Sequence, residues 1–124
     1  MEITDKQEIF NQLKSALAVY ADRMQPQSAN DRYELYTGKP VDILGRHFPT
    51  VYFAAVKINK GFVGFYYMPI YMNPALVADL PDRLKPLLKG KTCFHIKKLD
   101  EPLLQDITEL LTRGFAAYQA KSWI

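Results

Sequence analysis

Residues 50–74 read TVYFAAVKI (50–58), NKG (59–61) and FVGFYYMPIYMNP (62–74), and this stretch decides the fold. Two runs rich in aromatic and β-branched residues flank three turn residues, which predicts a β-hairpin. Gly61 takes the last position of the connection, where a left-handed backbone conformation is commonly needed. Neither run alternates cleanly between apolar and polar residues. We therefore expect both faces of these strands to be covered, or one face to line a pocket or an interface.

A first helix is predicted on the N-terminal side of the hairpin. Thr4 and Gln7 have the spacing of a capping box, which marks a helix start. The helix is expected to end at Gln25-Pro26, because the residue before proline avoids helical backbone angles. Between these points apolar residues recur at three- and four-residue spacing and form one stripe: Ile9, Leu13, Ala16, Leu17, Tyr20 and Met24.

A final helix is predicted at the C-terminal side. Asp100 is expected to cap it, with Pro102 as its second residue. Its buried stripe is expected to consist of Leu104, Ile107, Leu111, Phe115 and Tyr118. Glycine costs about 1 kcal/mol in a helix interior. The presence of Gly114 in this helix therefore indicates that another element approaches closely at that point.

Two or three further strands are predicted. Residues 32–37 (RYELYT) alternate, with Tyr33 and Leu35 on one face, and residues 91–97 (KTCFHIK) have the composition of another strand. Residues 41–44 could form a short extra strand. It is followed by a loop that carries Gly45, Arg46 and His47.

Two short helices are predicted between the hairpin and the strand at 91–97. Asn73-Pro74 begins the first, which continues to Leu80, and Pro81-Asp82 opens the second, which runs to about Leu88. Clustered strands with helices before and after them indicate the α+β class. We therefore expect one domain over residues 1–124, with a mainly antiparallel sheet of four strands or five.

Composition limits where the protein acts. Apolar residues are 48% and charged residues 23%, which is ordinary for a soluble globular domain. No apolar run approaches the length of a membrane span, and the start MEITDKQEIF has no signal-peptide hydrophobic region. The single cysteine, Cys93, rules out an intramolecular disulfide and fits a reducing compartment. We expect a cytoplasmic protein with no membrane association.

One segment of the chain, residues 83–98, is basic and contains no acid. Its candidate anion-binding residues are Arg83, Lys85, Lys89, Lys91, Lys97 and Lys98. The alternative is an ordinary solvated basic face. Neither GRHFPT nor KGKTCF matches the GxxxxGK[ST] phosphate loop, and a net charge of +3 is too small to indicate nucleic acid, so we expect no nucleic-acid partner.

Cys93 and His95 are two residues apart on a predicted strand, so their side chains share a face. Two ligands are too few for a structural metal site, and nothing in the sequence brings His47 near as a third. As a nucleophile, Cys93 would have His95 as a base but no third group to orient it. The alternative is a small buried cysteine in the core and a histidine at a strand edge. We therefore expect neither a metal nor another cofactor.

The aromatic residues of the hairpin form the best candidate site. On the second strand Phe62, Gly64, Tyr66 and Met68 share one face, and Gly64 leaves space between large side chains. The candidate ligand or interface surface consists of Tyr52, Tyr66, Tyr67, Met68 and Tyr71. Such a surface suits a pocket with a few phenol groups or a homodimer contact. The alternative is that these rings are core.

Several positions resemble the YdhG-like family, a group of small bacterial-type domains of unknown function. In that family an aromatic strand leads to a Met-Pro segment, and a Gly-Lys-x-x-x-x-Phe/Ile-Lys strand precedes the final helix. The matching positions here are Met68-Pro69, Gly90-Lys91, Phe94, Ile96 and Lys97. The resemblance covers nearly the whole chain, most clearly from Val51 onward. Some relatives are described as frataxin-like iron chaperones, so the resemblance implies iron or metal handling as one alternative.

These observations predict a binding or accessory domain that holds a small molecule or a protein on its aromatic sheet surface. Two alternatives stay open. The first is a frataxin-like metal chaperone, which only the resemblance implies. The second is a small enzyme that uses Cys93 and His95, although the sequence favours a non-enzymatic role.

Overall fold

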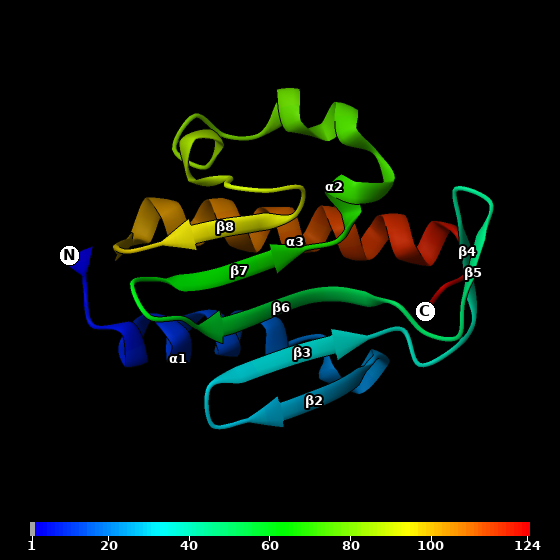
Figure 1. Ribbon diagram of the computed structural model, residues 1–124, viewed down its shortest axis with the longest axis horizontal. Helices are drawn as coiled ribbons and strands as arrows, with labels where there is room; N and C mark the ends of the chain where they lie inside the picture. The colour runs from blue at the N-terminus through cyan, green and yellow to red at the C-terminus, as the bar shows by residue number, and fades with distance from the viewer. Residues whose placement is uncertain (1) are drawn as a thin grey trace.

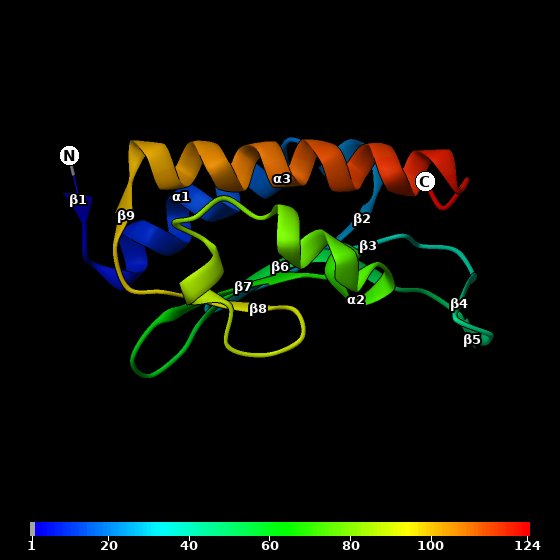
Figure 2. The ribbon, with the colours of Figure 1, turned by 90° about the horizontal axis from the view of Figure 1, so that it is seen from above.

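The computed structural model describes residues 2–124, and it has two layers: a sheet and a pair of helices packed on one of its faces. Figure 2 shows both helices on the same side of the sheet. The sheet has five antiparallel strands in the order β2-β3-β6-β7-β8. The strands are β2 (Gln25–Ala29), β3 (Arg32–Tyr36), β6 (Tyr52–Ile58), β7 (Val63–Tyr67) and β8 (Cys93–Ile96). The predicted α+β class is confirmed.

The predicted hairpin is the centre of this sheet (Figure 1). Strands β6 and β7 pair antiparallel, with Val56 opposite Phe65 and Ala54 opposite Tyr67. All four of these residues are at most 2% exposed. Because β6 and β7 have neighbours on both sides, their backbone groups are paired within the sheet, and their apolar side chains form most of the core layer.

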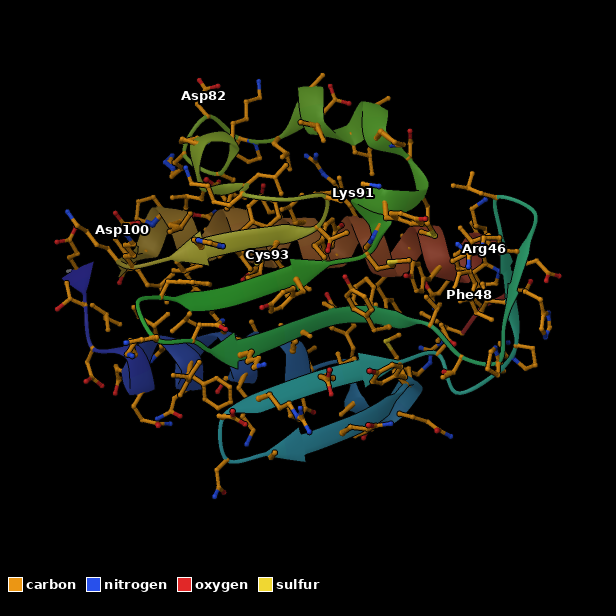
Figure 3. The ribbon with its side chains drawn as sticks, viewed as in Figure 1. Arg46, Phe48, Asp82, Lys91, Cys93 and Asp100 are labelled. Atoms are coloured by element: carbon orange, nitrogen blue, oxygen red, sulfur yellow. The ribbon has the colours of Figure 1, made fainter. Side chains whose placement is uncertain are left out.

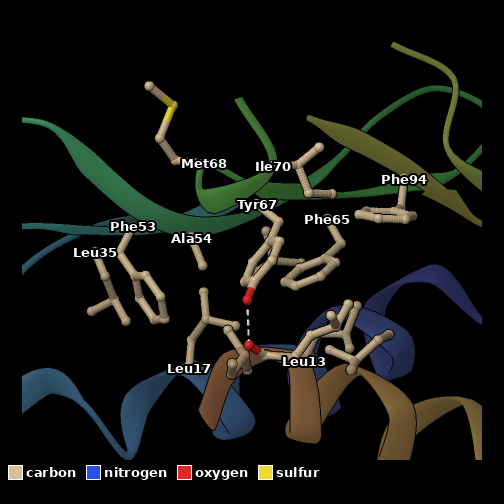
Figure 4. Packing of buried hydrophobic residues seen from close by; sticks show 14 of the residues in the cluster. Leu13, Leu17, Leu35, Phe53, Ala54, Phe65, Tyr67, Met68, Ile70 and Phe94 are labelled. Atoms are coloured by element: carbon tan, nitrogen blue, oxygen red, sulfur yellow. Dashed lines mark hydrogen bonds between the residues drawn. The ribbon is translucent and has the colours of Figure 1, made fainter. Parts of the chain in front are cut away.

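A β-bulge explains why β6 does not alternate in sequence. Tyr36 pairs with Tyr52 and Leu35 pairs with Ala54, so Phe53 has no partner on β3. Phe53 and Ala54 are both fully buried on the helix-covered side, as Figure 4 shows. The extra residue shifts the pleat by one position, which leaves Tyr52 and Ala55 on the opposite face.

Helix α1 (Lys6–Ala18) is shorter than the sequence predicts. Its cap is Asp5, whose carboxylate accepts a 3.0 Å hydrogen bond from the backbone N–H of Glu8, and Thr4 is not the cap. After Ala18 the chain forms the 3₁₀ helix η1 (Ala21–Arg23). Tyr20 and Met24 still pack on the core, although neither belongs to the α-helix. The apolar spacing therefore marks core contact correctly and overestimates helix length.

Strand β2 (QPQSA) is absent from the sequence-based prediction, because each of its residues is exposed and it carries no apolar pattern. It lies at the edge of the sheet and pairs only with β3. Proline is tolerated at such an edge, where one side of the strand needs no ladder hydrogen bond. Pro26 thus ends no helix here but lies inside an edge strand.

Two small antiparallel pairs lie outside the main sheet. The predicted strand at 41–44 exists as β4 (Val41–Ile43), but it pairs with β5 (Arg46–Phe48), where a loop is predicted. The turn between them has two left-handed residues, Leu44 with φ 50° and Gly45 with φ 79°. The other pair, β1 (Glu2–Ile3) with β9 (Leu99–Asp100), joins the beginning of the described chain to the start of the last helix.

Between β7 and β8 the chain forms only short helical turns. They are α2 (Pro69–Met72) and the 3₁₀ helices η2 (Pro74–Asp79) and η3 (Lys85–Leu87). The predicted short helix at 74–80 is confirmed as η2, which is a 3₁₀ helix, whereas the one predicted at 81–88 forms only over the three residues of η3. Each short helix has a proline at its first or second position, where a helix tolerates one. Pro74 and Pro81 follow α2 and η2, and because the residue before a proline avoids helical backbone angles, both helices stay short.

Helix α3 (Glu101–Ala120) agrees with the prediction at its start, where the Asp100 carboxylate accepts a 2.9 Å hydrogen bond from the Leu103 N–H. Of the predicted stripe, Ile107, Leu111 and Tyr118 are fully buried. Leu104 and Phe115 are only partly buried, and Leu103, Leu110 and Gly114 complete the buried face instead.

The close approach inferred at Gly114 is confirmed. A Cβ at this position would lie 2.9 Å from Cε1 of Phe53 and 3.0 Å from Cγ of Pro69. The Tyr67 hydroxyl reaches the same turn of the helix and donates a hydrogen bond to the Leu110 carbonyl, which Figure 4 marks with a dashed line. No helix within residues 2–124 has both the length and the apolar character needed to cross a membrane.

Candidate functional site

No helix within residues 2–124 packs over the face of the sheet away from α1 and α3, and Figure 3 looks onto this face. The register aligns one row of side chains across four strands on this face. The row runs from Glu34 on β3 through Ala55 on β6 and Tyr66 on β7 to Cys93 on β8. We call this surface the open face. The residues of one row are neighbours in space although they are far apart in sequence.

A depression of about 290 Å³ lies on the open face. Ala55 belongs to its lining and leaves room there, because its neighbours in the row have much longer side chains. Tyr52 and Tyr66 supply the aromatic walls. The complete lining consists of Arg32, Glu34, Tyr52, Ala55, Val56, Lys57 and Tyr66.

The Tyr66 ring occupies the space that the glycine two residues before it leaves free. A Cβ at Gly64 would lie 2.8 Å from Cε1 of Tyr66 and 3.0 Å from Nδ2 of Asn59. The Tyr66 ring therefore lies over Gly64, and any larger residue there would displace it. Burial raises the pKa of Tyr66, so its phenol stays protonated at neutral pH and acts as a hydrogen-bond donor.

Tyr52 is fixed at two points. Its hydroxyl donates a 2.9 Å hydrogen bond to Oγ1 of Thr92, and its carbonyl accepts a 2.9 Å hydrogen bond from the Tyr118 hydroxyl. Burial is the largest cause that raises the pKa of Tyr52. The ring is thus preorganised, and a ligand that contacts it does not have to order it first.

Three charged residues border the depression on the β3 side. Arg32 Nε lies 4.0 Å from Glu34 Oε1, and the Tyr36 hydroxyl donates a 3.4 Å hydrogen bond to Glu34 Oε2. Lys57 forms no ion pair with another residue in the described part of the chain. Two cations therefore face one carboxylate, and the depression has a net positive charge.

Cys93 and His95 share the open face, as predicted, but Cys93 is not a core residue. It is half-buried beside Tyr66, and the core position on this strand belongs to Phe94. Burial raises the pKa of the Cys93 thiol, which lowers the thiolate fraction that a nucleophile needs. His95 is stacked on Phe62, with ring centroids 3.7 Å apart and planes 9° apart.

His47 lies on β5, where its Nδ1 is 2.9 Å from Oδ1 of Asp42. Across residues 2–124, no three side chains of His, Cys, Asp or Glu converge as a metal ion would require. The three ligands weighed from the sequence, Cys93, His95 and His47, therefore do not form one metal-binding group.

The predicted aromatic surface divides between two sides of the sheet. Tyr52 and Tyr66 line the depression on the open face. Tyr67 is 2% exposed and points to α3 (Figure 4), so it does not share the open face with Tyr52 and Tyr66. Met68 is 8% exposed and is likewise part of the core cluster. Tyr71 is half-buried outside the depression, with Nζ of Lys91 5.9 Å from its ring centroid.

The six basic candidates divide as well. Arg83, Lys89, Lys97 and Lys98 line one cavity of about 400 Å³, whereas Lys85 and Lys91 do not. Two acids, Glu2 and Asp100, line the same cavity. Arg83 Nε is also 3.0 Å from Oδ2 of Asp106. These acids offset much of the positive charge that the sequence shows as an unbroken basic run.

The lining residues that sequence reasoning missed are on β3 and β6. Arg32 and Glu34 alternate with Tyr33 and Leu35, so the pattern of β3 does place them together on the face opposite the core. Nothing local in the sequence indicates that Ala55 and Lys57 lie beside them, because that depends on the register after the bulge.

Comparisons with models of protein families, with characterised proteins and with solved structures found no match to this chain.

Proposed function

We propose that this protein is a binding domain whose open face holds a flat small molecule against Ala55, between Tyr52 and Tyr66. The observation that carries the proposal is the depression itself. It lies on the helix-free side of the sheet, with one aromatic wall, Tyr52, fixed by a hydrogen bond and the other, Tyr66, lying over Gly64. Its volume of about 290 Å³ is near the lower end of the roughly 300–1,000 Å³ found for ligand pockets, which favours a ligand of one or two rings.

The polar groups favour an acidic substituent on that ring system. Lys57 and Arg32 outnumber Glu34 around the depression, and Lys57 has no partner carboxylate among the described residues. A charge-assisted hydrogen bond from Lys57 would hold a carboxylate at the edge of the ring. The neutral phenol of Tyr66 adds a donor. These contacts support an aromatic acid more than an aromatic cation.

The test compares 2-naphthoate with its fully saturated analogue, which has the same carbon skeleton but is not flat. Two-dimensional amide NMR should show shifts that cluster at residues 34, 55, 57 and 66 for the flat acid, with much weaker effects for the saturated one. Tyr66→Ala should abolish these shifts, because it removes one wall of the depression. Tyr71→Ala is the matched control, since Tyr71 is a half-buried tyrosine outside the lining.

Two results would contradict the proposal. One is equal binding of the flat and the saturated acid. The other is unchanged binding by Tyr66→Ala in a protein whose amide spectrum shows that the sheet is intact.

A further inference from the structure

A second cavity, of about 450 Å³, lies between the C-terminal half of α3, the segment around α2 and the β4–β5 hairpin. Figure 1 shows these elements at the end of the molecule where the chain terminates. The cavity shares no residue with the depression on the open face. Its lining consists of Asp42, Ile43, Leu44, Tyr67, Pro69, Met72, Asn73, Leu76, Arg113, Gly114, Ala117, Lys121 and Trp123.

The cavity exists because α3 presents small residues at this point. Gly114 and Ala117 are one turn apart and both line the cavity. The missing side chain of Gly114 lets Pro69 of α2 approach the helix. The methyl group of Ala117 does not fill the space beyond, between α3 and the hairpin. The walls around that space are predominantly apolar.

Leu44 at the tip of the hairpin is an exposed apolar side chain in this lining. It is 72% exposed, and among the described residues the other large hydrophobic side chain exposed to this degree is Val19 at 74%. Its backbone is left-handed, with φ 50°. Leucine rarely adopts this conformation, so the turn of the hairpin imposes it. The hairpin therefore holds an apolar side chain in water beside an apolar cavity, where a bound ligand would cover it.

The charges around the cavity are unequal. Arg113 and Lys121 both line it, and neither forms an ion pair with another residue of the described chain. Lys121 Nζ lies 5.5 Å from the centroid of the Trp123 ring. The carboxylate in the lining is Asp42, which is already 2.9 Å from Nδ1 of His47. Asp79 shares a smaller adjoining cavity of about 30 Å³ with Arg113 but does not pair with it.

We propose that this second cavity binds an amphipathic organic acid. The carboxylate of the ligand pairs with Arg113, whose planar guanidinium presents two parallel donors to such a group. The apolar body lies along Ala117 and is covered by Met72, Leu44 and Trp123. Lys121 is eight residues after Arg113, about 12 Å further along the helix axis, and its charge favours an anion over a neutral or cationic analogue.

The chain offers a direct reporter of occupancy, because Trp123 is its single tryptophan and it lines the cavity. The probe is decanoate, used below its micelle concentration, with decylamine as a matched ligand of opposite charge. Decanoate should change the Trp123 emission saturably, and calorimetry should give the same dissociation constant. Decylamine should bind at least about tenfold more weakly, since about 1.4 kcal/mol of charge preference is a factor of ten.

Variants locate the site. Arg113→Gln should weaken decanoate binding about tenfold, because it removes a charge-assisted pair. Leu44→Ser should weaken it severalfold. Val19→Ser is the matched control, because Val19 is equally exposed but lies outside the cavity, and it should have no effect. Tyr66→Ala on the open face should also leave decanoate binding unchanged, which separates this site from the first.

Three results would overturn the proposal. The first is decylamine binding as tightly as decanoate. The second is decanoate binding that Arg113→Gln and Leu44→Ser leave intact, in variants whose circular dichroism is unchanged. The third is no decanoate binding by either fluorescence or calorimetry, including the case in which sedimentation shows a second copy of the chain covering the cavity.

Discussion

The substitution Gly114→Ala tests how tightly α3 packs on the sheet. In an exposed helix, alanine in place of glycine stabilises by about 1 kcal/mol. Here the added Cβ would lie 2.9 Å from Cε1 of Phe53 and 3.0 Å from Cγ of Pro69, with the Tyr67 hydroxyl closer still. Phe53 is fully buried and Tyr67 is held by its hydrogen bond to Leu110, so neither can move away without loss.

The opposing contributions give the sign of the effect. Overpacking in a well-packed core costs about 1–3 kcal/mol. Displacing the Tyr67 hydroxyl from the Leu110 carbonyl costs about 1 kcal/mol more, which offsets the gain in helix propensity. We expect a net loss of about 1–3 kcal/mol in the free energy of unfolding. At about 4 °C per kcal/mol for a domain of this size, the melting temperature should fall by about 4–12 °C.

Urea and thermal denaturation measure this change, and the chain supplies two controls. A Cβ at Gly90 would meet nothing within 4 Å, so Gly90→Ala should change stability by no more than about 0.5 kcal/mol. The variant Tyr67→Phe lacks the hydroxyl that lies nearest to the added Cβ. In that background the loss in the free energy of unfolding caused by Gly114→Ala should therefore be smaller than in the wild type, by about 0.5 kcal/mol or more. A Gly114→Ala protein that melts above the wild type would refute the argument from close packing.

Three further predictions follow from the two faces of the sheet. Tyr67→Ala should lower the free energy of unfolding by about 3 kcal/mol or more, as core truncations of this size do, whereas Tyr66→Ala on the open face should cost markedly less; similar losses in urea titrations would contradict the assignment of faces. Alkylation of Cys93 should be slow at neutral pH and should accelerate only when the pH exceeds the pKa of an ordinary thiol, because burial raises the pKa of Cys93. Rapid labelling at pH 7, measured by mass spectrometry, would contradict this. Burial raises the pKa values of Tyr67 and Tyr118, so the folded state holds these protons more tightly than the unfolded state. The free energy of unfolding should be unchanged up to about pH 10, the ordinary pKa of tyrosine, and should decline as the pH rises above it. Melting temperatures that stay constant up to pH 11 would contradict this prediction.

The elements that the sequence predicts well are those whose pattern is local. Asp100 and Pro102 mark the start of α3, and the turn at 59–61 marks the central hairpin, because caps and turns are chosen by a few adjacent residues. Strand β2 is not predicted, because no local pattern marks it. Its sequence QPQSA has no apolar face, and only its pairing with β3 makes it a strand.

The candidate sites need information that no single segment contains. The alternation on β7 separates Tyr66 from Tyr67 correctly, but both faces are apolar, so the pattern cannot tell which face the helices cover. The bulge at Phe53 then decides that Ala55 lies beside Glu34. The second cavity combines residues 42–44, 67–76 and 113–123, which only the tertiary fold brings together.

A continuous path of contacts connects the two proposed sites, and we nevertheless expect them to bind independently. Trp123 in the second cavity packs edge-on against Tyr118 at 5.1 Å between ring centroids, and the Tyr118 hydroxyl bonds to the carbonyl of Tyr52 in the first site. Coupling requires an element with two arrangements that both ligands bias. Tyr118 is fully buried and hydrogen-bonded, which favours the single arrangement that the structure shows. In the wild-type protein, the dissociation constant of decanoate should therefore be the same with and without saturating 2-naphthoate. The NMR shifts at residues 34, 55, 57 and 66 first show that the two ligands do not compete for one site. A change beyond about fivefold, the lower end of typical allosteric effects, would mean that this aromatic path has a second arrangement.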